Sequence, residues 1–140
     1  MDETRLRELL SRGETLAVEF KRDRPQQISD REIYEAVACL ANSEGGALLI
    51  GVEDDGTITG ARPCHGAVTD PVRLQAAIFN NTEPPINTRV SIHRLPEGEV
   101  ITIEVDPYPD ICATKAGVCL WRMMGVGGPE CRPFYPWQHA

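Results

Sequence analysis

Two stretches decide the fold of this chain: GETLAVEFK (residues 13–21) and ANSEGGALLIGVEDDG (residues 41–56). Both read as strands flanked by turn-forming glycines and acids. If they pair as neighbours, one end of the resulting sheet gathers three carboxylates beside a basic cluster. The side chains concerned are Glu14, Glu19 and Asp54, and Lys21, Arg22 and Arg24.

The first stretch follows a short amphipathic helix. Leucines recur at helical spacing over residues 6–10, and Gly13 is typical of the position just beyond a helix end. Apolar and polar residues then alternate over 16–20, which predicts a strand with one buried face. In an unbroken strand Glu14 and Glu19 would point to opposite faces. They converge only if Glu14 lies in the turn after Gly13.

The second stretch follows the best-specified helix. Ser29 and Glu32 form a capping box, and an isoleucine on each side of it completes a hydrophobic staple, so we expect the helix to start at Ser29. Gly45-Gly46 ends it, before the wholly apolar run 47–52. A run that is apolar throughout is typical of a central strand covered on both faces.

The remaining elements complete a mixed sheet. We expect a hairpin turn at Asp55-Gly56 with a short strand at 57–59, a helix from Asp70-Pro71, strands at 86–92 and 100–105, and a strand at 118–122. The predicted fold is α+β, one domain over residues 1–140, with about three helices and a mixed sheet of about five to six strands. We expect an irregular tail at about 123–140.

Composition excludes several classes of protein. With 140 residues and 41% hydrophobic content, the chain suits one globular domain. It has no apolar stretch near the roughly 20 residues of a membrane span and no signal-peptide core at its start, so we expect a soluble cytoplasmic protein. Its five cysteines are odd in number and widely spaced, which favours reduced thiols over a disulfide framework or a zinc site.

Charge limits how the chain could bind nucleic acid. Its net charge of -7 argues against a broadly basic surface, so any contact with phosphates must be local. The candidates are Lys21, Arg22 and Arg24, with Arg122 farther along the chain. The alternative is a solvated charged rim with no ligand, and charge alone favours that alternative.

The three carboxylates are a candidate metal site. Carboxylates within about 4 Å of each other repel by several kcal/mol per pair, so a cluster needs a cation or protonation. Mg²⁺ or Mn²⁺ would suit Glu14, Glu19 and Asp54, where the ion could activate water while Lys21 steadies a phosphate. The alternative is that Asp54 forms a turn and both glutamates are exposed strand residues; spacing alone favours it.

Nucleotide binding is not indicated. No Gly-Lys-Ser/Thr follows Gly45-Gly46, and no GxGxxG opens a helix. We therefore expect neither a nucleotide cofactor nor ATPase activity.

The two opening stretches resemble the Schlafen AlbA-like domain. The likeness extends over most of the chain, through residues 58–60, 84–86, 100–105, 117–122 and 129–136. It implies an α+β domain that binds DNA or RNA, often upstream of a winged helix in bacterial transcriptional regulators. No winged helix is present here, so the chain is either a stand-alone version or the N-terminal piece of a longer regulator.

The resemblance also implies a second activity. In animal Schlafen ribonucleases, two glutamates and an aspartate form a metal-dependent RNA-cutting site, and these fall on Glu14, Glu19 and Asp54. Those enzymes use two lobes around a basic cleft, which a homodimer could rebuild here. We expect a regulatory nucleic-acid-binding domain; the alternatives are a metal-dependent endoribonuclease and a protein-interaction or dimerisation module.

Overall fold

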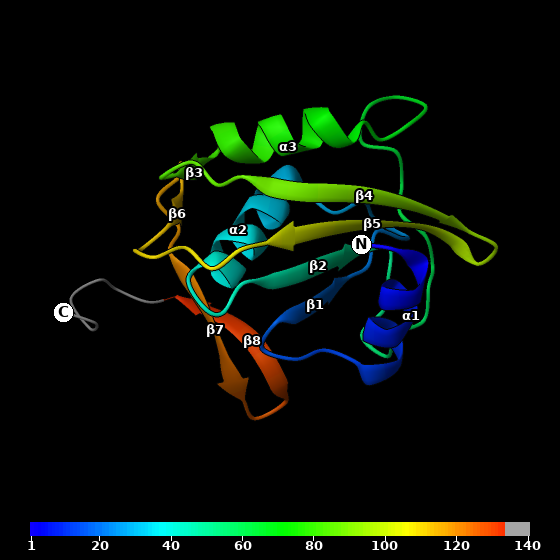
Figure 1. The fold of residues 1–140 in the computed structure, drawn as a ribbon, viewed down its shortest axis with the longest axis horizontal. Coiled ribbons are helices and arrows are strands. Elements are labelled where there is room, and N and C mark those ends of the chain that lie inside the picture. Colours follow the sequence, from blue (N-terminus) through cyan, green and yellow to red (C-terminus); the bar gives the residue numbers. More distant parts are fainter. Residues whose placement is uncertain (134–140) are drawn as a thin grey trace.

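The computed structural model describes residues 1–133. Figure 1 shows a sheet across the middle of the molecule, with three helices around it and a hairpin below. In chain order the elements are α1 (Glu3–Arg12), β1 (Val18–Lys21), α2 (Asp30–Ala41), β2 (Gly46–Ile50), α3 (Pro71–Asn80), β3 (Thr82–Glu83), β4 (Thr88–Leu95), β5 (Gly98–Val105), β6 (Ala113–Thr114), β7 (Leu120–Gly125) and β8 (Gly128–Pro133).

The main sheet has four strands in the order β1-β2-β5-β4. The two opening stretches do pair: β1 and β2 are parallel neighbours, with Lys21 opposite Ile50. β5 is antiparallel to both β2 and β4, which makes the sheet mixed. The predicted α+β class and three helices are confirmed, whereas the remaining strands form two separate two-stranded sheets, β3-β6 and β7-β8.

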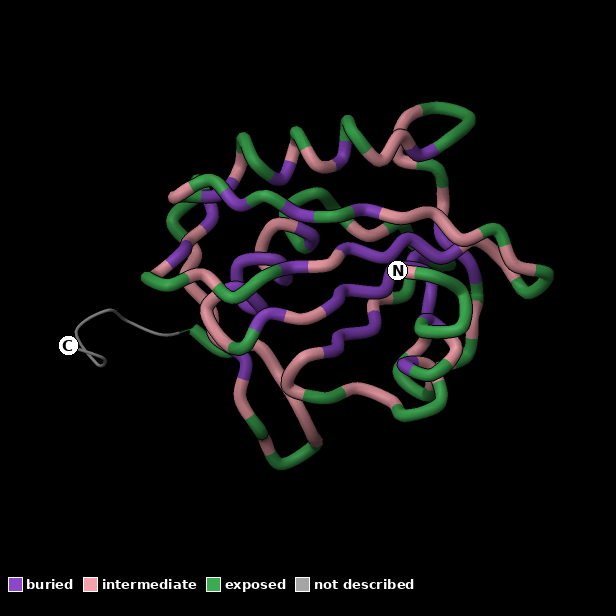
Figure 2. The backbone as a smooth tube through the Cα atoms, viewed as in Figure 1, coloured by how far each residue is buried: buried purple, intermediate pink, exposed green. Residues whose placement is uncertain are grey.

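Each face of the main sheet has its own core. Side chains of β2 alternate: Leu48 and Ile50 pack toward α2 and α3, while Ala47 and Leu49 pack toward α1. Figure 2 shows the result as buried segments through the strands, with exposed residues along the outer side of α3. Burial on both faces explains why the run 47–52 is apolar throughout.

Local sequence signals account for α2 and for the turn that follows it. The Ser29 hydroxyl accepts a hydrogen bond from the Glu32 N–H at 3.2 Å, as the capping box predicts. Gly46 then has φ of +139°, and a Cβ there would lie 1.9 Å from the Ala17 carbonyl oxygen. Glycine is therefore required where β2 begins beside the turn that precedes β1.

The start of β1 differs from the sequence prediction. Residues 16 and 17 lie in a turn, in which the Ala17 N–H donates to the Thr15 hydroxyl, and the strand begins at Val18. Val18, Glu19 and Phe20 are all buried, so β1 is covered on both faces instead of one. The predicted strand at 57–59 is reduced to a single bridge between Ile58 and Val52.

The irregular tail expected from about residue 123 is wrong over its first half. β7 continues to Gly125 and pairs with β8 in an antiparallel hairpin that closes at Gly125 and Gly128. Val126 and Gly127 form the turn between the two strands. Residues 134–140 of the expected tail lie outside the described residues.

The expectation that all cysteines are reduced is also wrong. Cys39 of α2 and Cys131 of β8 form a disulfide, while Cys64, Cys112 and Cys119 are free. Spacing in sequence could not indicate this pair, because its members are 92 residues apart. No helix among residues 1–133 combines the length and the apolar character needed to cross a membrane.

Candidate functional site

A polar hollow of about 650 Å³ opens where β1 ends. Three cationic and two acidic side chains line it, an excess of one positive charge in a chain whose net charge is -7. The charged residues are Lys21, Arg22, Arg24, Glu32 and Asp54. Ser29, the N-cap residue of α2, forms another wall. We call the three cations, Lys21, Arg22 and Arg24, the basic edge.

The basic edge is accessible to a ligand. The Arg22 side chain is 71% exposed, and Arg24 is also exposed. Lys21 Nζ lies 3.4 Å from a carboxylate oxygen of Glu19, and its side chain is 35% exposed. Arg22 reaches Glu53 only at 4.0 Å. The exposed pair of Arg22 with Glu53 is weak, and the Lys21 ammonium has further N–H donors besides the one that faces Glu19, so a phosphate could bind both cations.

Asp23, which sequence reasoning missed, fixes the segment that carries Arg24. Although it stands between two arginines, Asp23 is only 1% exposed. One of its carboxylate oxygens accepts the Ile28 N–H at 2.7 Å, and the other accepts the Arg62 N–H at 2.5 Å. These bonds close residues 24–28 into a fixed loop. Nothing in the sequence distinguishes this buried acid from its exposed neighbours.

The structure corrects the assignment of Arg122 to the phosphate-binding surface. Its side chain is 1% exposed and points inward from β7. The guanidinium donates to the backbone carbonyls of Thr15 at 3.0 Å and Val18 at 2.8 Å, and it lies 3.4 Å from a carboxylate oxygen of Glu19. We call these four residues the Arg122 network. Arg122 is a structural cation because all of these contacts are internal.

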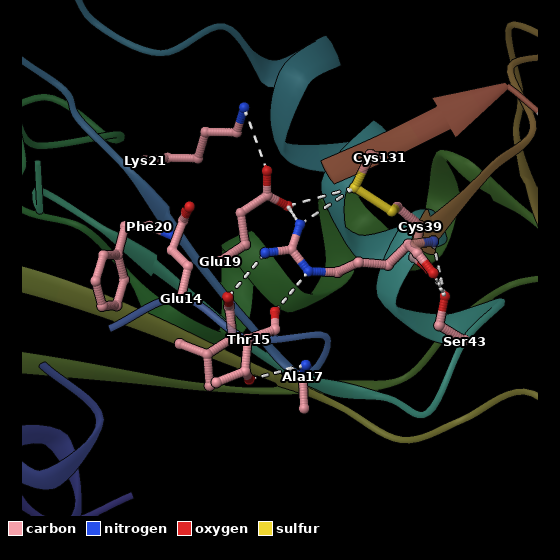
Figure 3. A network of polar contacts seen from close by, with 11 residues as sticks. Glu14, Thr15, Ala17, Glu19, Phe20, Lys21, Cys39, Ser43 and Cys131 are labelled. Carbon is pink, nitrogen blue, oxygen red and sulfur yellow. Dashed lines mark hydrogen bonds and ion pairs between the residues drawn. A yellow bond between two sulfur atoms is a disulfide. The ribbon is translucent and has the colours of Figure 1, made fainter. Parts of the chain in front are cut away.

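Figure 3 shows how the two glutamates differ. Glu19 is 8% exposed and lies between Lys21 and the Arg122 guanidinium. Its Oε1 atom is 3.4 Å from Lys21 Nζ, and its Oε2 atom is 3.4 Å from a guanidinium nitrogen of Arg122. Glu14 lies outside the strand, after Gly13, and its carboxylate accepts the Phe20 N–H at 2.7 Å. The condition set by the sequence, that Glu14 belong to the turn, is met.

Electrostatics place the three predicted carboxylates in one neighbourhood. Burial raises the pKa of Glu14, and the charges of Glu19 and Asp54 raise it further. The Phe20 N–H and the Arg122 guanidinium lower the same pKa, but they do not cancel the effect of burial. Glu14 is therefore held near other acids in a partly desolvated position.

The three carboxylates face different partners in this structure. Mg²⁺ or Mn²⁺ needs several carboxylate oxygens directed at one point. Glu14 is engaged by a backbone N–H, Glu19 faces two cations, and Asp54 is exposed at the rim of the hollow. Within residues 1–133 no three His, Cys, Asp or Glu side chains are grouped to hold a metal ion. Arg122 and Lys21 already supply the positive charge, so catalysis by this cluster stays a prediction.

Asn42 and Ser43, at the start of the second stretch, are structural. The Asn42 side chain donates to the carbonyls of Cys112 at 2.6 Å and Leu120 at 2.8 Å, and accepts the Cys112 N–H at 2.7 Å. The Ser43 hydroxyl accepts the Arg122 N–H at 2.8 Å. The pair thus ties the end of α2 to β7, which positions the Arg122 network.

The chain resembles known proteins in sequence and in structure. A family model described as Schlafen, AlbA_2 matches residues 14–125. The crystal structure of the DIP2311 protein from Corynebacterium diphtheriae superposes with a TM-score of 0.65 at 26% identity, over 85% of this chain and 22% of that one. The solution structure of the N-terminal domain of a RecG-related protein from Nitrosomonas europaea matches with a TM-score of 0.47 at 22% identity, over 75% of this chain and 71% of that one.

The matched range contains the Arg122 network and the pair Asn42 and Ser43. It spans Glu14 and Glu19 in the first stretch, Asn42 and Ser43 in the second, and Arg122 in β7. This chain spans only 22% of the length of the Corynebacterium chain. Because the model covers 14–125 of 140 residues, the chain belongs to the Schlafen AlbA_2 family.

Proposed function

We propose that this chain binds nucleic acid through the basic edge, as a regulatory domain of the Schlafen AlbA_2 family. The observation that carries the proposal is the polar hollow at the end of β1, where three cations gather on an acidic protein. Phosphate contacts supply most of the affinity of proteins for nucleic acid, and a local cluster is sufficient for them. Family membership supports the same class of ligand.

The arrangement suits a few phosphates of one strand. Lys21 follows the last buried residues of β1, and the Asp23 loop holds Arg24 beside it. Contacts of this kind carry no base specificity, because every nucleotide offers the same phosphate. We therefore expect weak binding of both DNA and RNA, with a salt dependence that corresponds to about two or three phosphates.

The test is fluorescence anisotropy with labelled single-stranded RNA and duplex DNA at low salt. Charge reversal by Lys21→Glu together with Arg22→Glu should weaken binding roughly tenfold or more and reduce the salt slope by about one per lost contact. The control is Arg89→Glu at the opposite end of the sheet, where the arginine is 57% exposed and pairs with Asp106; it reverses one charge where the test variant reverses two. Equal affinity of both variants and the wild type would contradict the proposal.

A further inference from the structure

The disulfide links two elements beside the proposed binding surface. Cys39 lies in α2 and is fully buried, whereas Cys131 lies in β8 and is half-buried. In the hairpin Cys131 is directly opposite Arg122. A side chain in this position can reach the same neighbours as the arginine.

The disulfide covers the ion pair of the Arg122 network. Cys131 Sγ lies 3.6 Å from a Glu19 carboxylate oxygen and 3.7 Å from a guanidinium nitrogen of Arg122, as Figure 3 shows for Glu19 and Cys131. Glu19 is consequently only 8% exposed although its neighbour Lys21 reaches the surface. The sulfur thus helps to keep water away from this carboxylate.

The two strands of the hairpin are held differently. β7 is tied to the end of α2 by Asn42 and Ser43, which bond to the backbone at Leu120 and Arg122. β8 is tied to α2 through the disulfide at Cys131. Cleavage of this bond should therefore loosen β8 first, at the register position that faces Arg122.

We propose that the Cys39–Cys131 disulfide is a redox-controlled cover over Glu19, and that its reduction weakens nucleic-acid binding at the basic edge. In the oxidised protein Glu19 is covered and shared between two cations, with one carboxylate oxygen facing Arg122 and the other facing Lys21, so Lys21 keeps part of its charge for a phosphate. In the reduced protein the loosened hairpin exposes Glu19. Water that replaces the sulfur weakens the ion pair of Glu19 with Arg122, so the negative charge of Glu19 acts more strongly on Lys21 and on an approaching phosphate. This inference rests on the proposed function.

The chemical step is thiol–disulfide exchange with a dithiol. One thiolate of the dithiol attacks Sγ of Cys131, the more exposed of the two residues, and the S–S electron pair leaves on Cys39 Sγ. The second thiolate of the dithiol then displaces Cys131 and closes the reductant's own disulfide. The protein gains two electrons and two protons, and the dithiol loses the same number.

The experiment compares oxidised and dithiothreitol-reduced protein in three measurements. Thiol titration under denaturing conditions should find three free cysteines in the oxidised chain and five in the reduced chain. Amide hydrogen exchange should rise in β8 on reduction, while β4 and β5 serve as an internal reference. Affinity for labelled RNA should fall about two- to fivefold, the size expected for one exposed charge interaction.

Variants separate this effect from other thiols. The double variant Cys39→Ser/Cys131→Ser should bind like reduced protein in both conditions, and Cys64→Ser, which changes a free cysteine, should keep the redox response. Equal affinity in the two states, or five free thiols after oxidation, would overturn the redox control alone. Binding in neither state would overturn the proposed function itself.

Discussion

The Arg122 network and the basic edge are two cationic regions that adjoin the same strand, yet they have opposite environments. The Arg122 side chain is 1% exposed and bonded to two carbonyls, whereas the Arg22 side chain is 71% exposed and 4.0 Å from its nearest carboxylate. The difference shows that charge near a site does not define its role. Burial and the number of internal partners decide whether a cation supports the fold or is available to a ligand.

The largest effect should come from removal of the buried cation. Arg122→Met substitutes an unbranched apolar side chain for the arginine. It removes the ion pair with Glu19 and the hydrogen bonds to the carbonyls of Thr15 and Val18. Breaking a buried ion pair typically costs about 3–5 kcal/mol, so urea denaturation should show a loss of this size. The contrasting variant Arg22→Met should change the free energy of unfolding by only about 0.5 kcal/mol. Similar losses in the two variants would remove the distinction between the regions.

The next effect concerns Asp23, the buried acid that holds the loop carrying Arg24. Asp23→Ala removes the acceptor of two backbone N–H groups and should cost about 2–4 kcal/mol in denaturation experiments. It should also weaken RNA binding, since the loop positions Arg24. The control is Asp55→Ala, which removes an exposed acceptor of the Thr57 N–H and should have a much smaller effect on stability. Unchanged RNA affinity in the Asp23 variant would show that Arg24 needs no fixed loop.

A smaller, pH-dependent effect is expected at Glu14. Its pKa in the folded protein is above the ordinary 4.5, mainly through burial, so ionisation of Glu14 opposes folding at neutral pH. Glu14→Gln keeps an oxygen for the Phe20 N–H and should raise the free energy of unfolding at neutral pH. Below the unfolded pKa the wild-type carboxyl is protonated in both states, and the gain should vanish. A gain that persists in acid would rule out the ionisation of Glu14 as its cause.

We expect the smallest effect from the addition of a divalent metal ion, on both metal binding and RNA cleavage. Because Lys21 and Arg122 already balance Glu19, Mn²⁺ followed by electron paramagnetic resonance should bind weakly, and Asp54→Ala should not alter it. End-labelled RNA should stay intact when it is incubated with Mn²⁺ and either the wild-type protein or the Asp54→Ala variant. Tight Mn²⁺ binding or RNA cleavage that is lost in the Asp54 variant would instead support the metal-dependent ribonuclease interpretation and place its ion at the acidic cluster.

Local signals in the sequence predict much of the fold. The capping box at Ser29 and Glu32 gives the start of α2, and the apolar run 47–52 gives the central strand. These features succeed because the residues that determine them are neighbours in the chain. The pairing of the two opening stretches was only a condition of the sequence analysis, and the structure meets it with β1 and β2 as parallel neighbours.

The site depends on contacts that local patterns do not encode. From its residue type alone Arg122 would be placed on the surface. Its structural role comes from hydrogen bonds to the carbonyls of Thr15 and Val18, which lie more than a hundred residues earlier. The strand β1 was expected to have one exposed face, but the β7-β8 hairpin covers Glu19. The basic edge could be predicted because Lys21, Arg22 and Arg24 are close in sequence as well as in space.

The Asn42 side chain has a consequence for how much of the chain forms one foldable unit. It bonds to the backbone at Cys112 and at Leu120, which lie 70 and 78 residues farther along. A chain truncated after β5 would keep all four strands of the main sheet yet leave this amide without its partners. The contacts of Asn42 thus set the minimum length of a chain that folds as one unit. In a series of C-terminal truncations followed by thermal denaturation, cooperative unfolding should be lost once Leu120 is removed.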